Sequence, residues 1–189
     1  MSRLLIVYGT TNGHTRKIAT ALGETLGEEG FPCDVFHAER IPRELDPAAY
    51  DGVVVAASVH ARGYQRAVKR WVRQHAGQLN LMPSAFISVC LGILERRPAA
   101  QTEVRAIMNR FLQASGWQPV ATKTVAGALL YTQYDWLTRW FMRRIVAKAG
   151  GDTDTTRDYE YTDWDDLRAF ARAFARKQMT IGQSIGALP

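Results

Sequence analysis

Cysteine is scarce in this chain. Cys33 and Cys90 are the two cysteines among 189 residues, and they have neither C-x-x-C spacing nor companion histidines. This excludes a disulfide framework and argues against a cysteine-ligated metal cluster. Isolated thiols are commonly packing residues, so we expect both to be buried.

Long apolar runs are also missing. No stretch approaches the ~20 apolar residues that span a bilayer. The apolar start at residues 4–8 is too short for the core of a signal peptide, and polar, glycine-containing sequence follows it without a small-residue cleavage pattern. We therefore expect a cytoplasmic protein whose contact with a membrane would be peripheral.

Acidic residues are outnumbered by basic ones. The chain has 24 Lys and Arg against 18 Asp and Glu, which gives a formal net charge of +6. This balance suits anionic partners, namely phosphate cofactors, acidic substrates, anionic lipid or nucleic acid. We expect no nucleic-acid partner, because the sequence has no recognised motif for one.

What the sequence does have is alternation between short Val- and Ile-rich runs and longer segments of helical period. This pattern predicts an α/β fold, a doubly wound five-stranded parallel sheet with helices on both faces. The expected strands are 3–8, 33–38, 52–58, 84–90 and 120–128. The expected helices are 15–29, 64–76, 100–115 and 164–177. No repeat or linker divides the chain, so we predict one domain over 1–177 and a flexible tail over 178–189.

One long segment, 129–162, interrupts the alternation as an insertion after or within the fifth strand. Insertions of this length in a compact domain are usually functional or disordered, and its many aromatic residues favour function. Its part from 136 to 148 has four cations, no acids, and apolar residues almost all round a helical wheel. It is either a lid packed on the sheet edge or a helix at a membrane interface. The candidate contact residues are Trp136, Arg139, Trp140 and Arg143.

A polar loop joins the first expected strand to the first expected helix. A helix N-terminus offers unpaired N–H groups and the positive end of the helix dipole, and threonine hydroxyls add donors. The P-loop pattern fails for want of its lysine, and the dinucleotide fingerprint for want of its glycines. A well-capped polar turn is the alternative. The loop borders the ligand crevice of a doubly wound sheet, so we predict a phosphate site there. Its residues are Thr10, Thr11, Asn12, Gly13, His14 and Thr15.

Two charged patterns remain open. Arg66, Lys69, Arg70 and Arg73 form one stripe along the expected second helix. The stripe is a solvated face, or it attracts a carboxylate-bearing substrate together with Arg62. The acidic run at 152–155 lacks the spacing of a calcium loop, so we interpret it as turn and capping residues and expect no metal site.

The strand, the T-T-N-G-H-T loop and the helix resemble the flavodoxin family. Further motifs resemble the flavodoxin-type protoporphyrinogen oxidase family over about residues 3–175. They are M-P-S-A-F at 82–86, A-G-A-L at 126–129 with Tyr131, Tyr134, Trp136 and Arg139, G-G-D-T-D-T at 150–155, and Y-T-D-W at 161–164. The resemblance implies FMN as cofactor, a porphyrinogen as substrate, and menaquinone or ubiquinone as electron acceptor. A quinone acceptor agrees with the interface alternative for the insertion, by which we expect peripheral contact with the inner membrane.

By the same resemblance, the flavin ring would lie between two loops. The first consists of Ser58, Val59, His60, Ala61, Arg62, Gly63 and Tyr64, and the second of Cys90, Leu91, Gly92, Ile93 and Leu94. Tyr64 would stack on the ring or pack on its neighbours, and His60 would stabilise the reduced flavin or lie on the surface. A quinone reductase of the same fold and a one-electron carrier are the rival functions, although carriers are commonly acidic. None of the four histidines forms an evident pair with a carboxylate, so the sequence names no general base.

Overall fold

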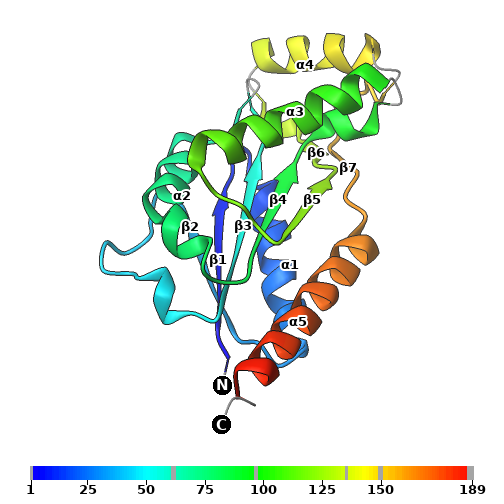
Figure 1. Cartoon of the computed structure of the whole chain (residues 1–189). Coiled ribbons are helices and arrows are strands. Elements are labelled where there is room, and N and C mark those ends of the chain that lie inside the picture. The colour runs from blue at the N-terminus through cyan, green and yellow to red at the C-terminus, as the bar shows by residue number, and fades with distance from the viewer. Residues whose placement is uncertain (1, 61–62, 96–97, 135, 149–150, 187–189) are drawn as a thin grey trace.

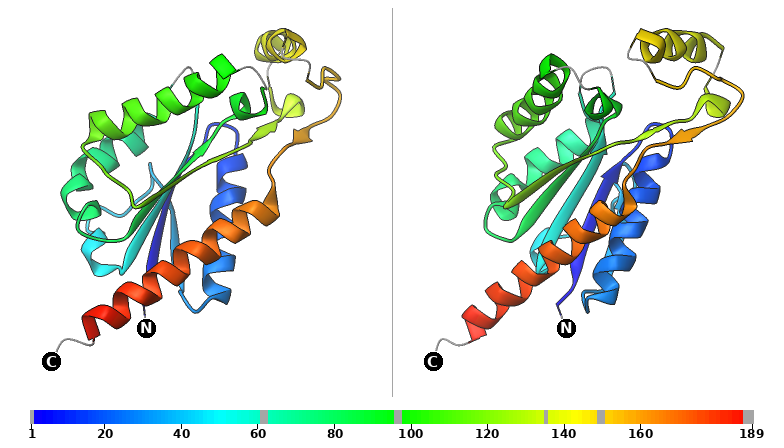
Figure 2. Two further views of the ribbon diagram at one scale, coloured as in Figure 1. Left: turned by 45° about the vertical axis from the view of Figure 1, so that its right-hand side comes forward. Right: turned by 90° about the vertical axis from the view of Figure 1, so that its right-hand side faces the viewer.

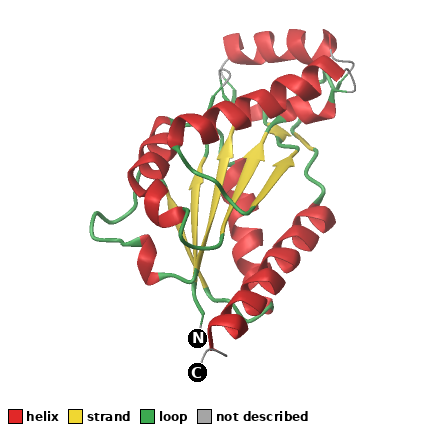
Figure 3. Ribbon diagram, viewed as in Figure 1, coloured by secondary structure: helices red, strands yellow, loops and turns green. Residues whose placement is uncertain are grey.

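The computed structural model describes residues 2–60, 63–95, 98–134, 136–148 and 151–186. Its centre is a five-stranded sheet in which every pairing is parallel and the strand order is β2-β1-β3-β4-β5 (Figures 1 and 3). The strands are β1 (Leu4–Gly9), β2 (Cys33–His37), β3 (Gly52–Ser58), β4 (Ser84–Val89) and β5 (Ala121–Val125). The order reverses between β1 and β3, and this reversal creates a crevice at the carboxyl ends of these two strands.

Helices cover both faces of the sheet (Figures 1 and 2). One face carries α1 (His14–Glu28) and α5 (Trp164–Gly186), and the other carries α2 (Arg66–Leu79) and α3 (Pro98–Ser115). Side chains of β1 alternate between the two layers, with Leu4 and Ile6 in the α1 and α5 core and Leu5 and Val7 in the other. Both faces are buried because the strand is apolar throughout, as the sequence predicted.

The insertion forms a small unit of its own beyond the carboxyl ends of the strands (Figure 2). It contains β6 (Ala128–Leu129), the 3-10 turn η3 (Tyr131–Gln133), α4 (Trp136–Lys148) and β7 (Tyr159–Glu160), which pairs antiparallel with β6. Tyr131 is fully buried in its core with Leu129 and Val146. The segment is therefore an ordered hairpin-and-helix unit.

The expected fifth strand over 120–128 is wrong in one respect, because it is two strands in two sheets. The carbonyls of Ala126 and Gly127 accept hydrogen bonds from the Thr162 hydroxyl and the Tyr161 N–H. These carbonyls therefore bind the returning chain, and the backbone leaves β5 toward β7. The 3-10 turns η1 (Pro47–Ala49) and η2 (Leu91–Leu94) complete the fold.

The C-terminal helix is longer than the 164–177 expected from the sequence. Helix α5 continues to Gly186 rather than ending near residue 177, so helical backbone includes most of the segment expected as a tail. Cys33 and Cys90, the two cysteines expected to be buried, are both only half-buried.

Candidate functional site

The predicted phosphate loop is a tight turn between β1 and α1. Gly13 adopts a left-handed conformation, with φ of 84°, at the N-cap of α1. The turn is held by two hydrogen bonds, from Gly13 N to Thr10 Oγ1 at 2.9 Å and from Arg16 N to Gly13 O at 3.0 Å. The side chains of Thr11 and Asn12 are exposed. Helix geometry leaves the N–H groups of the first turn without intrahelical partners, so the loop presents donors to the crevice.

Thr15 supplies the clearest sign that this loop fits an anion. Its side chain is 1% exposed, and its Oγ1 has no hydrogen-bond partner. Buried hydroxyls almost always have a partner, and an orphaned one calls for a ligand or a water. Thr15 lies in the first turn of α1, where the dipole also favours an anion. The loop therefore fits a phosphate group.

Gln65 was not predicted, yet it joins the phosphate loop to the end of β3. Its Nε2 donates to Ser58 Oγ at 2.7 Å and to Thr11 Oγ1 at 3.2 Å, and its buried Oε1 has no partner. A Cβ on Gly9 would lie 2.4 Å from Val68 Cγ2 and 2.9 Å from Gln65 Oε1. Glycine at position 9 is what lets the start of α2 pack this closely on the loop.

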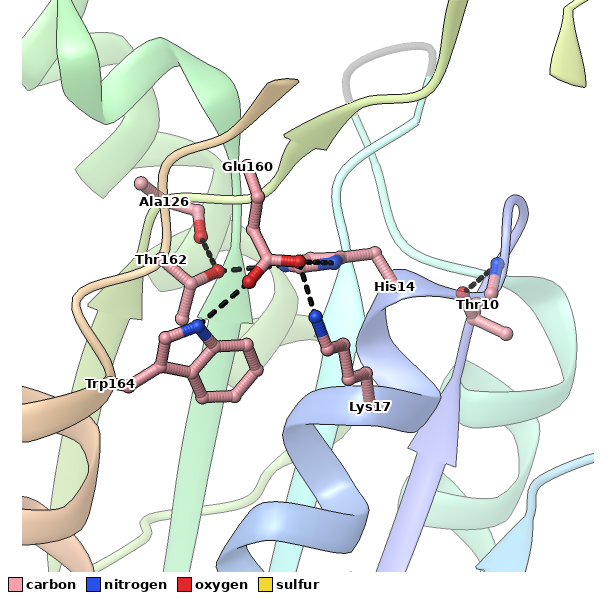
Figure 4. A network of polar contacts seen from close by, with 8 residues as sticks. Thr10, His14, Lys17, Ala126, Glu160, Thr162 and Trp164 are labelled. Atoms are coloured by element: carbon pink, nitrogen blue, oxygen red, sulfur yellow. Dashed lines mark hydrogen bonds and ion pairs between the residues drawn. The ribbon is translucent and has the colours of Figure 1, made fainter. Parts of the chain in front are cut away.

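His14 points away from the phosphate turn, toward the base of the insertion (Figure 4). Its Nε2 lies 2.7 Å from Thr162 Oγ1, and its Nδ1 lies 3.8 Å from Glu160 Oε2. Burial lowers the pKa of His14, although the Glu160 carboxylate opposes that shift. No histidine is evidently paired with a carboxylate in the sequence, and the structure places the His14 ring beside Glu160, a residue far away in the chain. His14, one of the predicted phosphate-loop residues, is therefore held by two residues of the insertion.

Glu160 is the centre of the same network. It accepts hydrogen bonds from Lys17 Nζ at 2.6 Å and from Trp164 Nε1 at 2.7 Å (Figure 4). Its pKa is lowered: the partial burial of the carboxyl opposes this, but the bonds from Lys17 and Trp164 and the Lys17 charge prevail. The network holds β7 and the start of α5 against the first turn of α1.

The loop after β3 lies beside the phosphate loop, because Gln65 bonds both Ser58 and Thr11. His60 and Gly63 form a two-bond bridge, with N···O distances of 2.7 and 3.0 Å, that closes the loop. The His60 side chain is exposed, which agrees with the alternative that it lies on the surface. Ala61 and Arg62, two predicted site residues, lie outside the described residues.

Tyr64 is not placed to stack on a flavin. It is 5% exposed, and its ring packs edge-on against Phe86 and Phe111 with centroid distances of 5.1 and 5.0 Å. Its hydroxyl lies 2.7 Å from Ser88 Oγ, and burial raises its pKa to about 12. Aromatic neighbours occupy the space around the ring. Tyr64 therefore packs on its neighbours, and the expectation that it stacks on the flavin is wrong.

The loop after β4 meets the loop after β3 at the same sheet edge. Val59 N donates to Val89 O, and Cys90 N donates to Val125 O, each at 2.9 Å. Gln101 of α3 holds the following turn by donating to the carbonyls of Ile93 and Glu95. Leu91, Gly92 and Ile93 are half-buried and Leu94 is exposed. Three loops from β1, β3 and β4 therefore converge, as a planar cofactor with a phosphate arm requires.

The remaining candidates lie on the helices α2 and α4. Arg66 is exposed at the start of α2, and Arg143 is exposed on α4. Trp136 and Trp140 are 80% and 53% exposed, one helical turn apart. Arg139 is half-buried and donates from Nη2 to Tyr134 O at 3.0 Å, which gives it a structural role.

The acidic run after α4 serves the chain itself. Asp154 Oδ1 accepts bonds from the N–H and hydroxyl of Thr156, and Asp152 accepts one from the Tyr161 hydroxyl. Within the described ranges, no group of His, Cys, Asp and Glu side chains is arranged to hold a metal ion. Among the described residues, no helix has the length and hydropathy needed to cross a bilayer.

Comparison with known proteins agrees with this geometry. The family model for the flavodoxin domain matches residues 5–156. A protein of Escherichia coli K12 named protoporphyrinogen IX dehydrogenase (quinone) is 38% identical over 174 residues, which cover 92% of this chain and 94% of the relative. A Leishmania major protein of the same name is 33% identical over 95% of this chain and 77% of its own length.

Among solved structures, a short-chain flavodoxin associated with a non-canonical PDU bacterial microcompartment superposes with a TM-score of 0.60. The match covers 94% of this chain and 99% of that flavodoxin at 14% identity, and it therefore speaks to the fold. The strand order, the phosphate turn and the sequence matches all indicate the same family. This chain belongs to the flavodoxin-domain family, in company with the proteins named protoporphyrinogen IX dehydrogenase.

Proposed function

We propose that this chain is an FMN-dependent dehydrogenase that oxidises protoporphyrinogen IX and passes the electrons to a quinone. The near-full-length match to the E. coli dehydrogenase carries the proposal. It leaves 15 of the 189 residues unmatched, fewer than the insertion contains, so the likeness extends into the segment that interrupts the basic fold.

The first turn of α1 is suited to hold the FMN phosphate. The Thr15 hydroxyl would gain the partner it lacks, and the N–H groups of His14 and Thr15 would donate from the positive end of the helix. The loops at Val59–His60 and Cys90–Leu94 would flank the ring. When bound, FMN supplies reversible two-electron chemistry, while the protein orients and shields the reactants.

Each pair of hydrogens that leaves the porphyrinogen reduces one quinone to a quinol, so electrons and protons balance. Two buried groups at these loops, Cys90 and Tyr64, are poorly suited as bases. Burial raises the pKa of both Cys90 and Tyr64, and both are protonated at neutral pH. We infer that the proton leaves through solvent or the cofactor, and that the protein contributes binding and position.

Helix α4 supports a peripheral membrane contact, where the quinone would be reached. Trp136 and Trp140 are exposed, and Arg144 lies over the Trp140 ring at 5.0 Å. Exposed tryptophans next to arginines suit the boundary between lipid and water. This combination favours the membrane alternative over a lid, whose aromatic side chains would be covered.

The cofactor site is tested by Thr15→Val. The substitution removes a hydroxyl that makes no bond in this structure, so the apoprotein should keep its stability, while FMN should bind about tenfold more weakly. Fluorescence quenching of titrated FMN measures the affinity. Thr20→Val, an exposed position on the same helix, is the matched control and should leave the affinity unchanged. Equal affinity for the wild type and Thr15→Val would remove Thr15 from the phosphate site.

The reaction is tested by steady-state quinone reduction under anaerobic conditions. Protoporphyrinogen IX and NADH are offered as alternative donors to the FMN-loaded protein. We expect turnover with the porphyrinogen. Turnover with NADH alone would instead identify a quinone reductase, and turnover with neither would favour an electron carrier.

The membrane contact is tested by co-sedimentation with vesicles that contain phosphatidylglycerol. Trp136→Ser combined with Trp140→Ser should reduce binding. Leu81→Ser is the control, since Leu81 is 91% exposed and lies before β4, away from α4. If the double variant sediments like the wild type, α4 is not the contact.

A further inference from the structure

A small hollow between α2 and α3 has an apolar floor and a cationic rim. We call it the α2–α3 pocket, and its cavity volume is about 250 Å³. Ile107 and Phe111 of α3, both nearly buried, form the floor. Lys69 and Arg73 of α2 form the rim with Arg110 of α3. The two helices lie beside each other on the same face of the sheet (Figure 1).

The rim charges have no ion-pair partner among the residues that the structure describes. No carboxylate lines the pocket, and none of the three cations forms an ion pair with a described residue. Some other cations of the described chain are paired, as Lys17 is with Glu160 at 2.6 Å and Lys123 with Asp166 at 2.7 Å. Lys69 and Arg73, four residues apart on one helix, repel each other weakly. An anion in the pocket would relieve this repulsion.

A second hollow shows that this arrangement is not general on the surface. It lies beside α1 and has a volume of about 500 Å³, but Glu24 lines it and its Lys17 is already paired. The α2–α3 pocket differs because its charges have one sign and converge over apolar side chains. This combination suits an anionic group carried by an apolar body.

The pocket also reaches the redox site proposed above. Gly63 lines it, and Gly63 is bridged to His60 in the loop after β3. A ligand held at the rim would therefore extend toward this loop. The pocket is smaller than the usual range of about 300–1,000 Å³ for a whole ligand site, so it admits one arm of a larger molecule.

We propose that the α2–α3 pocket binds a carboxylate arm of the tetrapyrrole substrate, and so fixes its orientation at the flavin. The inference rests on the proposed function. The planar forks of Arg73 and Arg110 can each bind a carboxylate through two hydrogen bonds, and Lys69 adds a point charge. The chain therefore selects a tetrapyrrole with ionised propionates. Of the stripe for which a carboxylate-bearing substrate was one interpretation, Lys69 and Arg73 line the pocket, whereas Arg66 and Arg70 do not.

The test compares protoporphyrin IX with its dimethyl ester, which has the same ring but no ionised carboxylates. Binding to the FMN-loaded protein is followed by porphyrin fluorescence, without turnover. The wild type should bind the diacid at least about fivefold more tightly than the ester. Arg73→Gln and Arg110→Gln should each weaken diacid binding by about fivefold and leave ester binding unchanged.

Arg105→Gln provides the matched control, because Arg105 is an exposed arginine of α3 outside the pocket. It should bind both porphyrins as the wild type does. FMN content of every variant is measured in parallel and should not change.

Three outcomes would overturn the inference. The first is equal binding of the diacid and the ester by the wild type. The second is a loss of diacid binding in Arg105→Gln as large as that in the pocket variants. The third is unchanged diacid binding by Arg73→Gln and Arg110→Gln together with a loss of their binding to phosphatidylglycerol vesicles. The last would assign the pocket to an anionic lipid. Porphyrin binding is measured without catalysis, so a protein that binds the diacid through the pocket but fails to oxidise porphyrinogen would contradict the proposed function alone.

Discussion

The Nε2 of His14 lies 2.7 Å from the Oγ1 of Thr162, which is 148 residues away in the sequence. The Thr162 hydroxyl donates to Ala126 O, so it accepts from His14, and the imidazole carries its proton on Nε2. Ala126 precedes the insertion and Thr162 is its last residue. This one contact therefore ties both ends of the insertion to the helix whose N-terminus forms the phosphate loop.

Thr162→Val should destabilise the protein. The buried hydroxyl makes both bonds, and its loss leaves the Ala126 carbonyl and the His14 N–H without partners. We expect the free energy of unfolding to fall by about 1–3 kcal/mol in urea titrations. Thr122→Val, an exposed position on β5, is the control and should change it by less than about 0.5 kcal/mol. Equal stabilities for the two variants would contradict the network.

The pKa of His14 should lie below its ordinary value of 6.5, because burial disfavours the charged ring. Glu160 raises this pKa, so Glu160→Gln should lower it further. An NMR titration of the His14 ring measures both values. Glu24→Gln, exposed on α1, should leave the pKa unchanged. A rise in Glu160→Gln would refute the assigned contact.

The same shift makes stability depend on pH in a defined direction. Between the folded pKa and 6.5 the unfolded chain binds more protons at His14 than the folded chain does. The contribution of His14 to the free energy of unfolding is thus fully present above 6.5 and decreases as the pH falls toward the folded pKa. In His14→Asn, this part of the pH dependence should vanish.

Two glycines near α1 should respond to alanine with opposite signs. Gly13 has φ of 84°, so Gly13→Ala forces a side chain into the left-handed region and should destabilise by about 1–2 kcal/mol. Gly27 lies within the helix with open space around its Cβ position, and Gly27→Ala should stabilise by about 0.5–1 kcal/mol. Thermal unfolding of the apoproteins measures both. The conformation assigned to Gly13 is wrong if both changes stabilise.

Tyr64→Phe should separate packing from cofactor contact. It removes the hydroxyl beside Ser88 and should cost about 1 kcal/mol of stability, measured in urea. The ring remains against Phe86 and Phe111, so the absorbance spectrum of bound FMN should match that of the wild type. A shifted flavin spectrum would show that the Tyr64 hydroxyl contacts the cofactor, whereas this structure places it beside Ser88.

The sheet and its helices follow from local sequence pattern. Strands buried on both faces give continuous apolar runs such as Leu4–Gly9, and the spacing of Val68, Trp71 and Val72 identifies the inner face of α2. The phosphate turn is local too, since Gly13 and its neighbours stand at a strand-to-helix junction. These features could be predicted because each depends on residues adjacent in the chain.

What the sequence could not provide depends on distant contacts. His14, Glu160 and Thr162 meet only because β7 returns beside α1, and no spacing rule connects them. Gln65 could have been suspected from its place after the loop, but its partners Thr11 and Ser58 lie on other elements. The burial of Tyr64 likewise depends on Phe111 of α3.

The central claim is tested most directly by mixing the FMN-loaded protein with protoporphyrinogen IX in the absence of oxygen, and then adding a soluble menaquinone analogue. The account predicts that flavin absorbance is bleached on the first addition and recovers on the second, while porphyrin fluorescence appears. The apoprotein should show neither change until FMN is restored. A loaded protein whose flavin stays oxidised with protoporphyrinogen, yet is bleached by dithionite, would contradict the account.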